Sequence, residues 1–205
     1  LITPGVALND GILEAGSNNF LAAVHFSASK GSAFKNSQKI GVSFLDISTG
    51  EFLSSEGNAA YVDKLLQNFN PSEVIFSKQK RKLFSETFGD NFHVFHLEDW
   101  VFHKDYALET LHKHFDTKNL KGFGVDHLEH GTIASGAALH YLAETQHNKL
   151  KHITKIARIA EDQYVWMDRF TIRNLELYHS HQQNAVTLLD VIDKTISPMG
   201  GRMLK

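Results

Sequence analysis

The sequence predicts an α/β protein in which a mixed β-sheet is flanked by helices. Two patterns in the first half indicate this class. Three runs rich in β-branched and aromatic residues come first, and segments with a helical period of apolar residues then alternate with short apolar runs. A strand–helix–strand order that follows a hairpin is typical of a mixed sheet covered by helices. Helical patterns predominate in the second half, so a mainly α-helical segment is expected after the sheet.

Three strands are expected at the start of the sheet. Residues 20–27, 39–48 and 50–55 are rich in β-branched and aromatic side chains, and each run ends at turn residues. Thr49 and Gly50 stand where a tight hairpin would join the second strand to the third. The sheet is therefore expected to open with antiparallel neighbours.

Alternating helices and strands follow this hairpin. Apolar residues between 58 and 69 recur at the three-and-four spacing of an amphipathic helix, which Pro71 ends. Two strands and two helices are expected to complete the first domain: strand 73–77, helix 79–88, strand 92–96 and helix 105–115. A five-stranded RNase H-like arrangement fits this order. The predicted fold is therefore an RNase H-like mixed sheet with flanking helices, followed by the mainly α-helical segment.

A link with two glycines, Gly122 and Gly124, precedes the second half. Residues 126–146 have the length of a long helix, and small inward side chains such as Ala134 and Ala138 suit the interior of a helix bundle. Shorter elements are expected after it: strands at 153–160 and 164–167, helices from about 168 and over 182–193, and a break at Pro198, Gly200 and Gly201 before a new helical start at 202–205. Two domains are predicted, 1–117 and 118–205, and the second is expected to be cut short.

The composition is that of a globular protein without a strong charge. Of the 205 residues, 42% are hydrophobic and 21% are charged, and the formal net charge is −2, so the surface supplies no large attractive field for nucleic acid. The absence of cysteine excludes disulfides, thiolate catalysis and sulfur-ligated zinc sites. The sequence has no apolar run long enough to span a bilayer and no secretory signal at its start, so a cytoplasmic location without membrane association is expected.

A metal-dependent nuclease is the alternative function that an RNase H-like sheet suggests. Such a site needs clustered carboxylates, including one on the first strand, yet residues 20–27 contain none. The strand carboxylates are Asp46, Glu51 and Glu73. Asp46 is more simply interpreted as a turn residue that accepts hydrogen bonds from backbone N–H groups.

Other candidate chemistry is also weakly supported by the sequence. No P-loop motif occurs, so ATP hydrolysis by this chain is not expected. Three close pairs of histidines lack the layout of a zinc site, so no metal site is expected: His93 with His96, His127 with His130, and His179 with His181. No catalytic residue is therefore assigned.

Five segments of the chain resemble the MutS family of DNA mismatch repair proteins. They are TPG (3–5), FLDISTGEF (44–52), FGV (123–125), MDRFTIRNLEL (167–177) and LLDVIDKTISPMGGRMLK (188–205). The last two are long and specific, and the resemblance runs along essentially the whole chain. It implies that residues 1–117 are the family's non-catalytic, RNase H-like connector domain. Residues 118–205 would be the N-terminal part of its core and lever region.

The resemblance also implies a function. The chain would lack the ATPase domain and would not itself be an enzyme. It would relay conformational change between DNA-binding and ATPase regions and offer a surface to MutL. A passive structural spacer is the alternative to a relay, and the sequence does not distinguish the two. The expected partner-binding residues are Glu109, Thr110 and His112, and the expected hinge residues are Gly122 and Gly124. No cofactor is expected here; ATP and magnesium would bind elsewhere in the full-length protein, which would act on mismatched double-stranded DNA as a homodimer.

Overall fold

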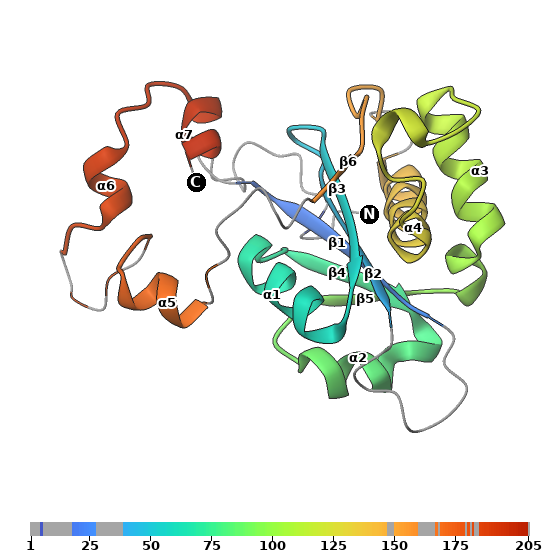
Figure 1. The fold of residues 1–205 in the computed structure, drawn as a ribbon, viewed down its shortest axis with the longest axis horizontal. Helices are drawn as coiled ribbons and strands as arrows, with labels where there is room; N and C mark the ends of the chain where they lie inside the picture. The colour runs from blue at the N-terminus through green and yellow to red at the C-terminus, as the bar shows by residue number, and fades with distance from the viewer. Residues whose placement is uncertain are drawn as a thin grey trace. The chain divides into compact units, whose positions relative to one another are not determined.

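The computed structural model describes residues 18–27, 39–146, 150–159, 169–178 and 185–204, together with the single positions Gly5, Met167, Ser180 and Gln182. The chain divides into two compact units. The first consists of Leu1–Leu8 and Asn19–Ile159, and the second of Asn9–Asn18 and Ala160–Lys205. The first unit contains the sheet and the larger helices (Figure 1).

Three antiparallel strands form the centre of the sheet. They are β1 (Phe20–Phe26), β2 (Ile40–Asp46) and β3 (Glu51–Gly57). β2 pairs with β1 on one side and with β3 on the other, and Phe20 lies opposite Asp46 in the first of these pairs. The predicted antiparallel opening of the sheet is confirmed.

The turn between β2 and β3 is built around the carboxylate of Asp46. Its Oδ1 accepts hydrogen bonds from the N–H of Ser48 at 2.8 Å and from the Ser48 hydroxyl at 2.7 Å, and its Oδ2 accepts the N–H of Asn19 at 3.1 Å. The N–H of Gly50 donates to the Asp46 carbonyl at 2.9 Å, with the glycine at a φ of 75° that favours residues without a Cβ. Asp46 is thus the turn residue that the sequence predicts.

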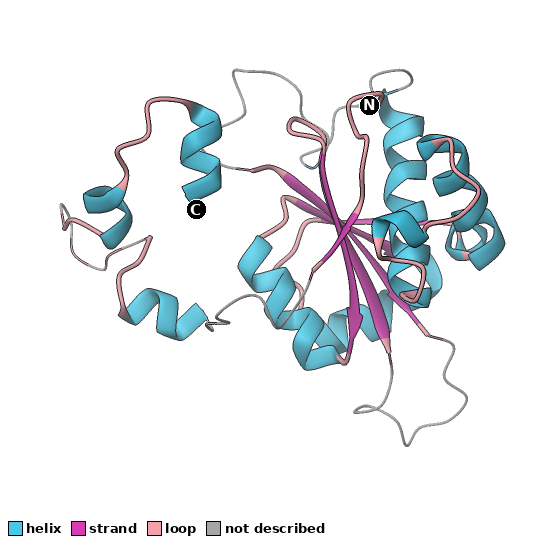
Figure 2. Ribbon diagram, turned by 45° about the horizontal axis from the view of Figure 1, so that its top comes forward, coloured by secondary structure: helices cyan, strands magenta, loops and turns pink. Residues whose placement is uncertain are grey.

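Three parallel pairings extend the sheet at both edges. β4 (Glu73–Ser77) pairs with β1, β5 (Val94–Leu97) pairs with β4, and β6 (Ala157–Arg158) pairs with β3. The resulting order is β5-β4-β1-β2-β3-β6. The sheet has six strands rather than the five expected, because part of the predicted strand at 153–160 joins its edge. The strands fan through the middle of the unit with helices on both sides (Figure 2), which confirms the α/β class.

Helices α1 (Ala59–Phe69) and α2 (Arg81–Phe88) cover one face of the sheet. The side chain of Asn58 caps α1 by accepting the N–H of Tyr61 at 2.9 Å. Aromatic rings fix both helices to the strands: Phe69 stacks on Phe44 with ring centroids 4.3 Å apart, and Phe84 stacks on Phe76 at 4.2 Å.

The other face is covered by the short helix η3 (Asp99–Phe102) and by α4 (Glu129–Gln146), with α3 (Lys104–Phe115) packed on α4. Glycines permit the close approach of α4 to β2 and of α3 to α4. A Cβ on Gly41 of β2 would overlap the backbone of His130 in α4, and one on Gly136 of α4 would lie 2.5 Å from Ala107 of α3. The small side chains of α4 predict that this helix lies in the interior of a helix bundle, and this prediction is wrong. They allow α4 to lie directly against the sheet.

The first unit extends beyond Thr117, where the sequence predicts a domain boundary, and continues to Ile159. Helix α4 supplies a large part of its core, and Ile153 and Ile156 are each only 2% exposed within that core. The N–H of Ile159 donates to the carbonyl of Ser54 at 2.9 Å, which fixes the segment that follows β6 to β3. The packing of α4 and β6 therefore joins residues 118–159 to the sheet.

In the described part of the second unit there are three short helices, α5 (Arg169–Asn174), α6 (Leu188–Ile192) and α7 (Pro198–Leu204). Two predicted helix starts are wrong. The helix expected from 182 begins only at Leu188, because Thr187 and Asp190 form a reciprocal capping box. The helix expected from 202 begins at Pro198, since proline needs no N–H partner in a first turn and the Ser197 hydroxyl accepts the Gly200 N–H at 3.1 Å.

The strand expected at 164–167 lies largely outside the described residues. None of the helices in the described ranges is both long and apolar enough to cross a membrane.

Candidate functional site

The three predicted partner-binding residues lie on α3, and we call them the α3 surface (Glu109, Thr110 and His112). Glu109 is exposed, and Thr110 and His112 are half-buried. Glu109 and His112 stand three residues apart, so they lie on neighbouring parts of one helix side. The Thr110 hydroxyl donates to the carbonyl of Tyr106 at 2.8 Å. The structure therefore brings Glu109 and His112 together at the surface, while the Thr110 hydroxyl bonds to its own helix.

The opposite side of α3 is held firmly. Ala107 and Leu111 are fully buried, and Ala107 lies against Gly136 of α4. The ring of His114 makes a hydrogen bond to the carbonyl of Ile153 at 2.8 Å, which connects the end of α3 to the segment before β6. The α3 surface is thus presented by a helix that is packed on α4 and cannot rotate without breaking these contacts.

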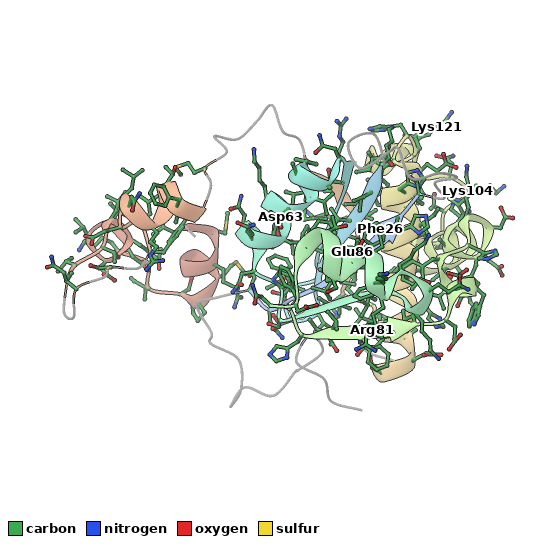
Figure 3. The ribbon with its side chains drawn as sticks, turned by 90° about the horizontal axis from the view of Figure 1, so that it is seen from below. Phe26, Asp63, Arg81, Glu86, Lys104 and Lys121 are labelled. Atoms are coloured by element: carbon green, nitrogen blue, oxygen red, sulfur yellow. The ribbon has the colours of Figure 1, made fainter. Side chains whose placement is uncertain are left out.

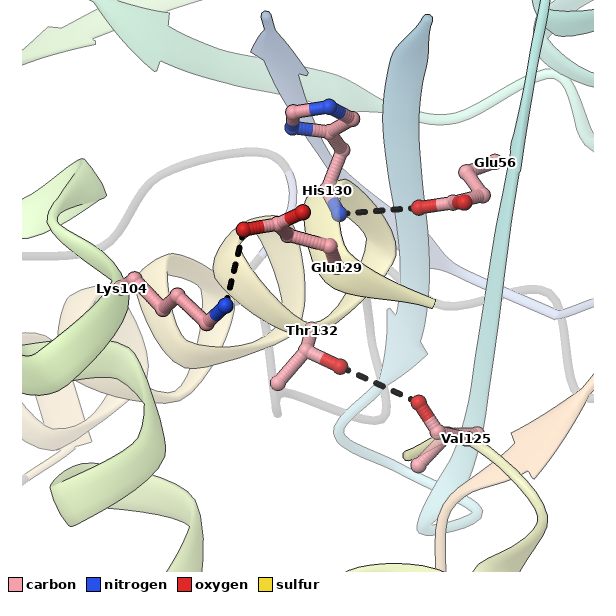
Figure 4. Close-up of polar contacts among 6 residues, drawn as sticks. All are labelled: Glu56, Lys104, Val125, Glu129, His130 and Thr132. Carbon is pink, nitrogen blue, oxygen red and sulfur yellow. Dashed lines mark hydrogen bonds and ion pairs between the residues drawn. The ribbon is translucent and has the colours of Figure 1, made fainter. Parts of the chain in front are cut away.

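Polar contacts connect the first turn of α4 to both α3 and the sheet (Figure 4). Glu129 pairs with Lys104 of α3 at 2.8 Å, and the N–H of His130 donates to Glu56 of β3 at 2.9 Å. The Thr132 hydroxyl donates to the carbonyl of Val125 at 3.2 Å. The hydrogen bond between Lys104 and Glu129 raises the pKa of the lysine and lowers the pKa of the glutamate, but both side chains are exposed and contribute little stability.

A histidine pair lies where the end of β1 meets α4. The ring of His25 stacks on Phe102 with centroids 6.0 Å apart and lies 5.4 Å from the ring of His130. Burial, with smaller contributions from the neighbouring His130 and Lys80, lowers the pKa of His25 to about 4. His25 is therefore neutral near pH 7 and acts as a packing residue.

The carboxylates required by the nuclease hypothesis do not come together. Asp46 lies opposite Phe20, and Glu73 lies opposite Leu21 on the next position of β1. Successive residues of a strand point to opposite faces, so the two carboxylates lie on different sides of the sheet. Glu51 is exposed. Among the residues that the structure describes, no group of three His, Asp or Glu side chains is arranged to hold a metal ion.

Glu73 has a structural role that sequence reasoning missed. It is 4% exposed, and its carboxylate accepts the Tyr141 hydroxyl of α4 at 3.1 Å and the N–H of Gly5 at 3.2 Å. A Cβ on Gly5 would lie 2.9 Å from the Cβ of Glu73, so glycine is required for this approach. The signal was a single carboxylate that precedes the apolar residues Val74, Ile75 and Phe76 in a buried strand. This contact attaches Gly5 to β4 and α4.

The predicted hinge glycines lie inside the first unit. Gly122 belongs to the short helix η4 (Lys121–Phe123), and Gly124 follows it at a φ of 69°. A Cβ on either glycine would meet nothing within 4 Å. Leu120 and Val125 are buried on either side, so the glycines form an exposed turn between two anchored points.

The histidine pairs singled out in the sequence are dispersed in the structure. His96 packs on Phe76 with ring centroids 4.8 Å apart, while His93 is exposed. His127 lies beside Asp126, with Nδ1 and Oδ1 3.8 Å apart. His179 and His181 lie outside the described residues. The sequence also contains a cluster of basic residues, Lys78, Lys80, Arg81 and Lys82. It lies on η2 (Lys78–Lys80) and α2, where Figure 3 shows Arg81, and Lys104 lies on a different element, α3.

Comparisons with known proteins identify the family. The family model "MutS domain II" matches residues 19–154, which is more than half of the chain and falls within the first unit. The chain is 65% identical over its whole length to the DNA mismatch repair proteins MutS of Flavobacterium psychrophilum and Christiangramia forsetii, and it covers 23% and 22% of their lengths. It is 50% identical to the corresponding protein of Cytophaga hutchinsonii and covers 23% of that length. The predicted RNase H-like connector fold agrees with this match, and the chain belongs to the MutS family of DNA mismatch repair proteins, of which it contains domain II.

Proposed function

We propose that this chain is a non-catalytic connector of a MutS-type ATPase, which relays conformational change between DNA-binding and ATPase regions and offers its α3 surface to MutL. The full-length protein would bind ATP and magnesium and act on mismatched double-stranded DNA as a cytoplasmic homodimer. The observation that carries the proposal is that exposed Glu109 and half-buried His112 lie on a helix whose other side is fixed by Ala107 and Leu111. A docking surface of this kind loses little conformational entropy when a partner binds.

A relay requires a body that moves without deforming. The first unit meets this requirement because α4 packs on β2 and α3 with no room for an added Cβ at Gly41 or Gly136. A displacement imposed at the α3 surface would therefore reach the sheet through α4. The hinge proposed at Gly122 and Gly124 would change the backbone conformation of an exposed turn within this unit.

The MutL contact is tested by measuring binding of the chain to the N-terminal domain of a MutL protein from the same species. Glu109→Arg is expected to weaken binding at least tenfold, because it reverses the charge at the centre of the α3 surface. Glu86→Arg is the matched control, since Glu86 is an exposed glutamate on α2 (Figure 3). Equal binding by the two variants, or no binding by the wild-type chain at high micromolar concentration, would contradict the proposal.

The hinge is tested in the full-length protein with Gly124→Ala and Gly89→Ala. Both glycines have a positive φ, 69° and 79°, in open space. Gly124 is in the left-handed helical region, where alanine costs roughly 1 kcal/mol, whereas Gly89 has a ψ of −170°, a conformation that alanine adopts at a cost of about 1–3 kcal/mol. Gly89→Ala is therefore at least as destabilising as Gly124→Ala. Only Gly124→Ala is expected to reduce the stimulation of ATP hydrolysis by mismatched DNA. A similar reduction in both variants would indicate a general loss of stability and contradict the hinge.

A further inference from the structure

Three aromatic rings from three separate elements meet at the surface beside α3. Trp100 comes from η3, Tyr106 from α3 and His140 from α4, and we call them the aromatic patch. The ring centroids of Trp100 lie 4.9 Å from Tyr106 and 5.2 Å from His140, and those of Tyr106 and His140 are 5.5 Å apart. Each pair has an edge-to-face geometry. Trp100 nevertheless remains 50% exposed, so half of this large side chain is uncovered.

One hydrogen bond and one histidine–carboxylate contact hold Tyr106 and His140 of the patch in place. The hydroxyl of Tyr106 and Nδ1 of His140 are 2.7 Å apart, and Nε2 of His140 lies 3.4 Å from a carboxylate oxygen of Glu144. Burial lowers the pKa of His140, so the imidazole is neutral near pH 7. The tyrosine hydroxyl then donates to Nδ1 and the Nε2–H points to Glu144. The negative charge of Glu144, whose side chain is 62% exposed, is not neutralised by this histidine.

Other acidic residues lie near the patch residues along the chain. Glu98 precedes Trp100 by two residues and makes only a long ion pair of 3.9 Å with Lys78. Glu109 follows Tyr106 by three residues, so the two share one side of α3. Lys104, the nearest basic residue on α3, is engaged by Glu129 at 2.8 Å. An exposed indole beside carboxylates is complementary to a flat cation. The guanidinium of arginine can stack on the indole ring and form an ion pair with a carboxylate.

We propose that the aromatic patch receives an arginine side chain of the protein that docks on the α3 surface. The guanidinium would stack on the exposed part of Trp100 and pair with Glu144. The inference rests on the proposed function, because Tyr106 of the patch and Glu109 of the α3 surface stand three residues apart on one side of α3. Tryptophan, tyrosine and arginine are the residues that most often dominate the energy of protein interfaces.

The test measures binding of the MutL N-terminal domain to four variants of the chain. Trp100→Ala is expected to weaken binding at least tenfold, and Trp100→Phe less, because phenylalanine keeps a ring face. Glu144→Gln is expected to weaken binding severalfold and to reduce its dependence on salt. Phe170→Ala is the matched control, since Phe170 is an aromatic residue that is 72% exposed in the second unit. Thermal unfolding of each variant checks that it is folded.

A second measurement does not depend on MutL. The chain's other tryptophan, Trp166, lies outside the described residues, and Trp166→Phe leaves Trp100 as the single tryptophan. Titration of this variant with a hexa-arginine peptide is expected to change its fluorescence saturably, and more than a hexalysine peptide does. The same titration after adding Glu144→Gln is expected to show a weaker response.

The possible outcomes separate the two proposals. If Glu109→Arg abolishes MutL binding but Trp100→Ala leaves it unchanged, the inference is overturned and the proposed function stands. If the wild-type chain does not bind MutL, the proposed function fails, and the arginine titration then decides whether the patch recognises a guanidinium. An absent or unsaturable response overturns the inference. Concentration-dependent self-association that Trp100→Ala removes would assign the patch to a second copy of the chain and also overturn it.

Discussion

At the scale of single residues, Asp46 shows how one carboxylate determines the geometry of a turn. It is fully buried and accepts hydrogen bonds from the backbone N–H groups of Ser48 and Asn19. These donors come from both sides of the strand end, so the carboxylate fixes the start of β1 to the end of β2. A buried acceptor of this kind is costly to remove, because its donors are left without partners.

Asp46→Ala is expected to lower the free energy of unfolding by about 2–4 kcal/mol, since it leaves several N–H groups unsatisfied. Urea denaturation at pH 7 measures the change. Asp46→Asn retains one oxygen acceptor and is expected to lose less stability.

The Asp46→Ala variant also tests the nuclease alternative. Cleavage of labelled DNA by the wild-type chain with magnesium or manganese, abolished in Asp46→Ala, would overturn the non-catalytic proposal.

His25 makes the stability of the fold depend on pH, because burial disfavours its protonated form and lowers its pKa. Its pKa is about 4 in the folded chain and 6.5 in its ordinary state, so the unfolded chain binds a proton between these values that the folded chain does not. Stability therefore falls as the pH drops from about 6.5 towards 4, by up to about 3 kcal/mol for this group.

His25→Phe is expected to flatten this dependence, because phenylalanine keeps a ring against Phe102 and does not titrate. Urea denaturation at several pH values from 4 to 7.5 measures the slope for wild type and variant. His127→Phe is the control, since His127 is exposed. An unchanged slope in His25→Phe would show that other groups cause the acid sensitivity.

At the scale of elements, α4 determines how the first unit is assembled. One side lies against β1, β2 and β3, and another lies against α3. Gly136 permits the second approach, because an added Cβ would lie 2.5 Å from the Cα of Ala107. Alanine normally stabilises a helix interior by about 1 kcal/mol relative to glycine. Here that gain competes with overpacking, which costs about 1–3 kcal/mol.

Gly136→Ala is accordingly expected to reduce the free energy of unfolding by about 1–2 kcal/mol, since overpacking against backbone atoms outweighs helix propensity. Gly122→Ala is the matched control, because a Cβ there meets nothing within 4 Å. Its effect is expected to stay within about 0.5 kcal/mol. Chemical denaturation compares the two, and a stabilising Gly136→Ala would show that α3 and α4 separate more easily than their packing indicates.

At the scale of the whole molecule, the division between the two units lies after Ile159. The core of the first unit includes α4, in which Ala134, Ala137 and Leu142 are fully buried. Residues 118–159 therefore complete the fold that the sheet begins. Without α4, one face of the sheet would be exposed to water.

Two shortened chains test where the first unit ends. A chain that ends at Ile159 is expected to keep the cooperative thermal unfolding of the first unit, because its core is complete. A chain that ends at Thr117 is expected to lose cooperative unfolding, because α4 and β6 are missing. Circular dichroism and NMR chemical-shift dispersion distinguish the two, and a cooperatively folded 1–117 chain would contradict the division at Ile159.

Much of the first unit was determined by local sequence alone. Short runs rich in β-branched and aromatic residues located the strands from β1 to β5, and the spacing of apolar residues located α1 to α3, because these patterns depend on local backbone geometry. The length of the predicted helix at 126–146 located α4. The role of Asp46 and the exposure of Glu109 were likewise readable from neighbouring residues. Local reasoning failed for α7, where Pro198 and two glycines resemble a helix break but form a first turn.

Only the tertiary structure decided which elements pack together. It placed α4 on the sheet instead of in a bundle, added β6 to β3, buried Glu73 beneath Tyr141, and joined Trp100, Tyr106 and His140 into one patch. These contacts join residues that are distant in sequence. The spacing of apolar residues along one strand or helix carries no information about such partners. They depend on shape, on glycines that allow close approach, and on the burial of apolar area across the whole unit.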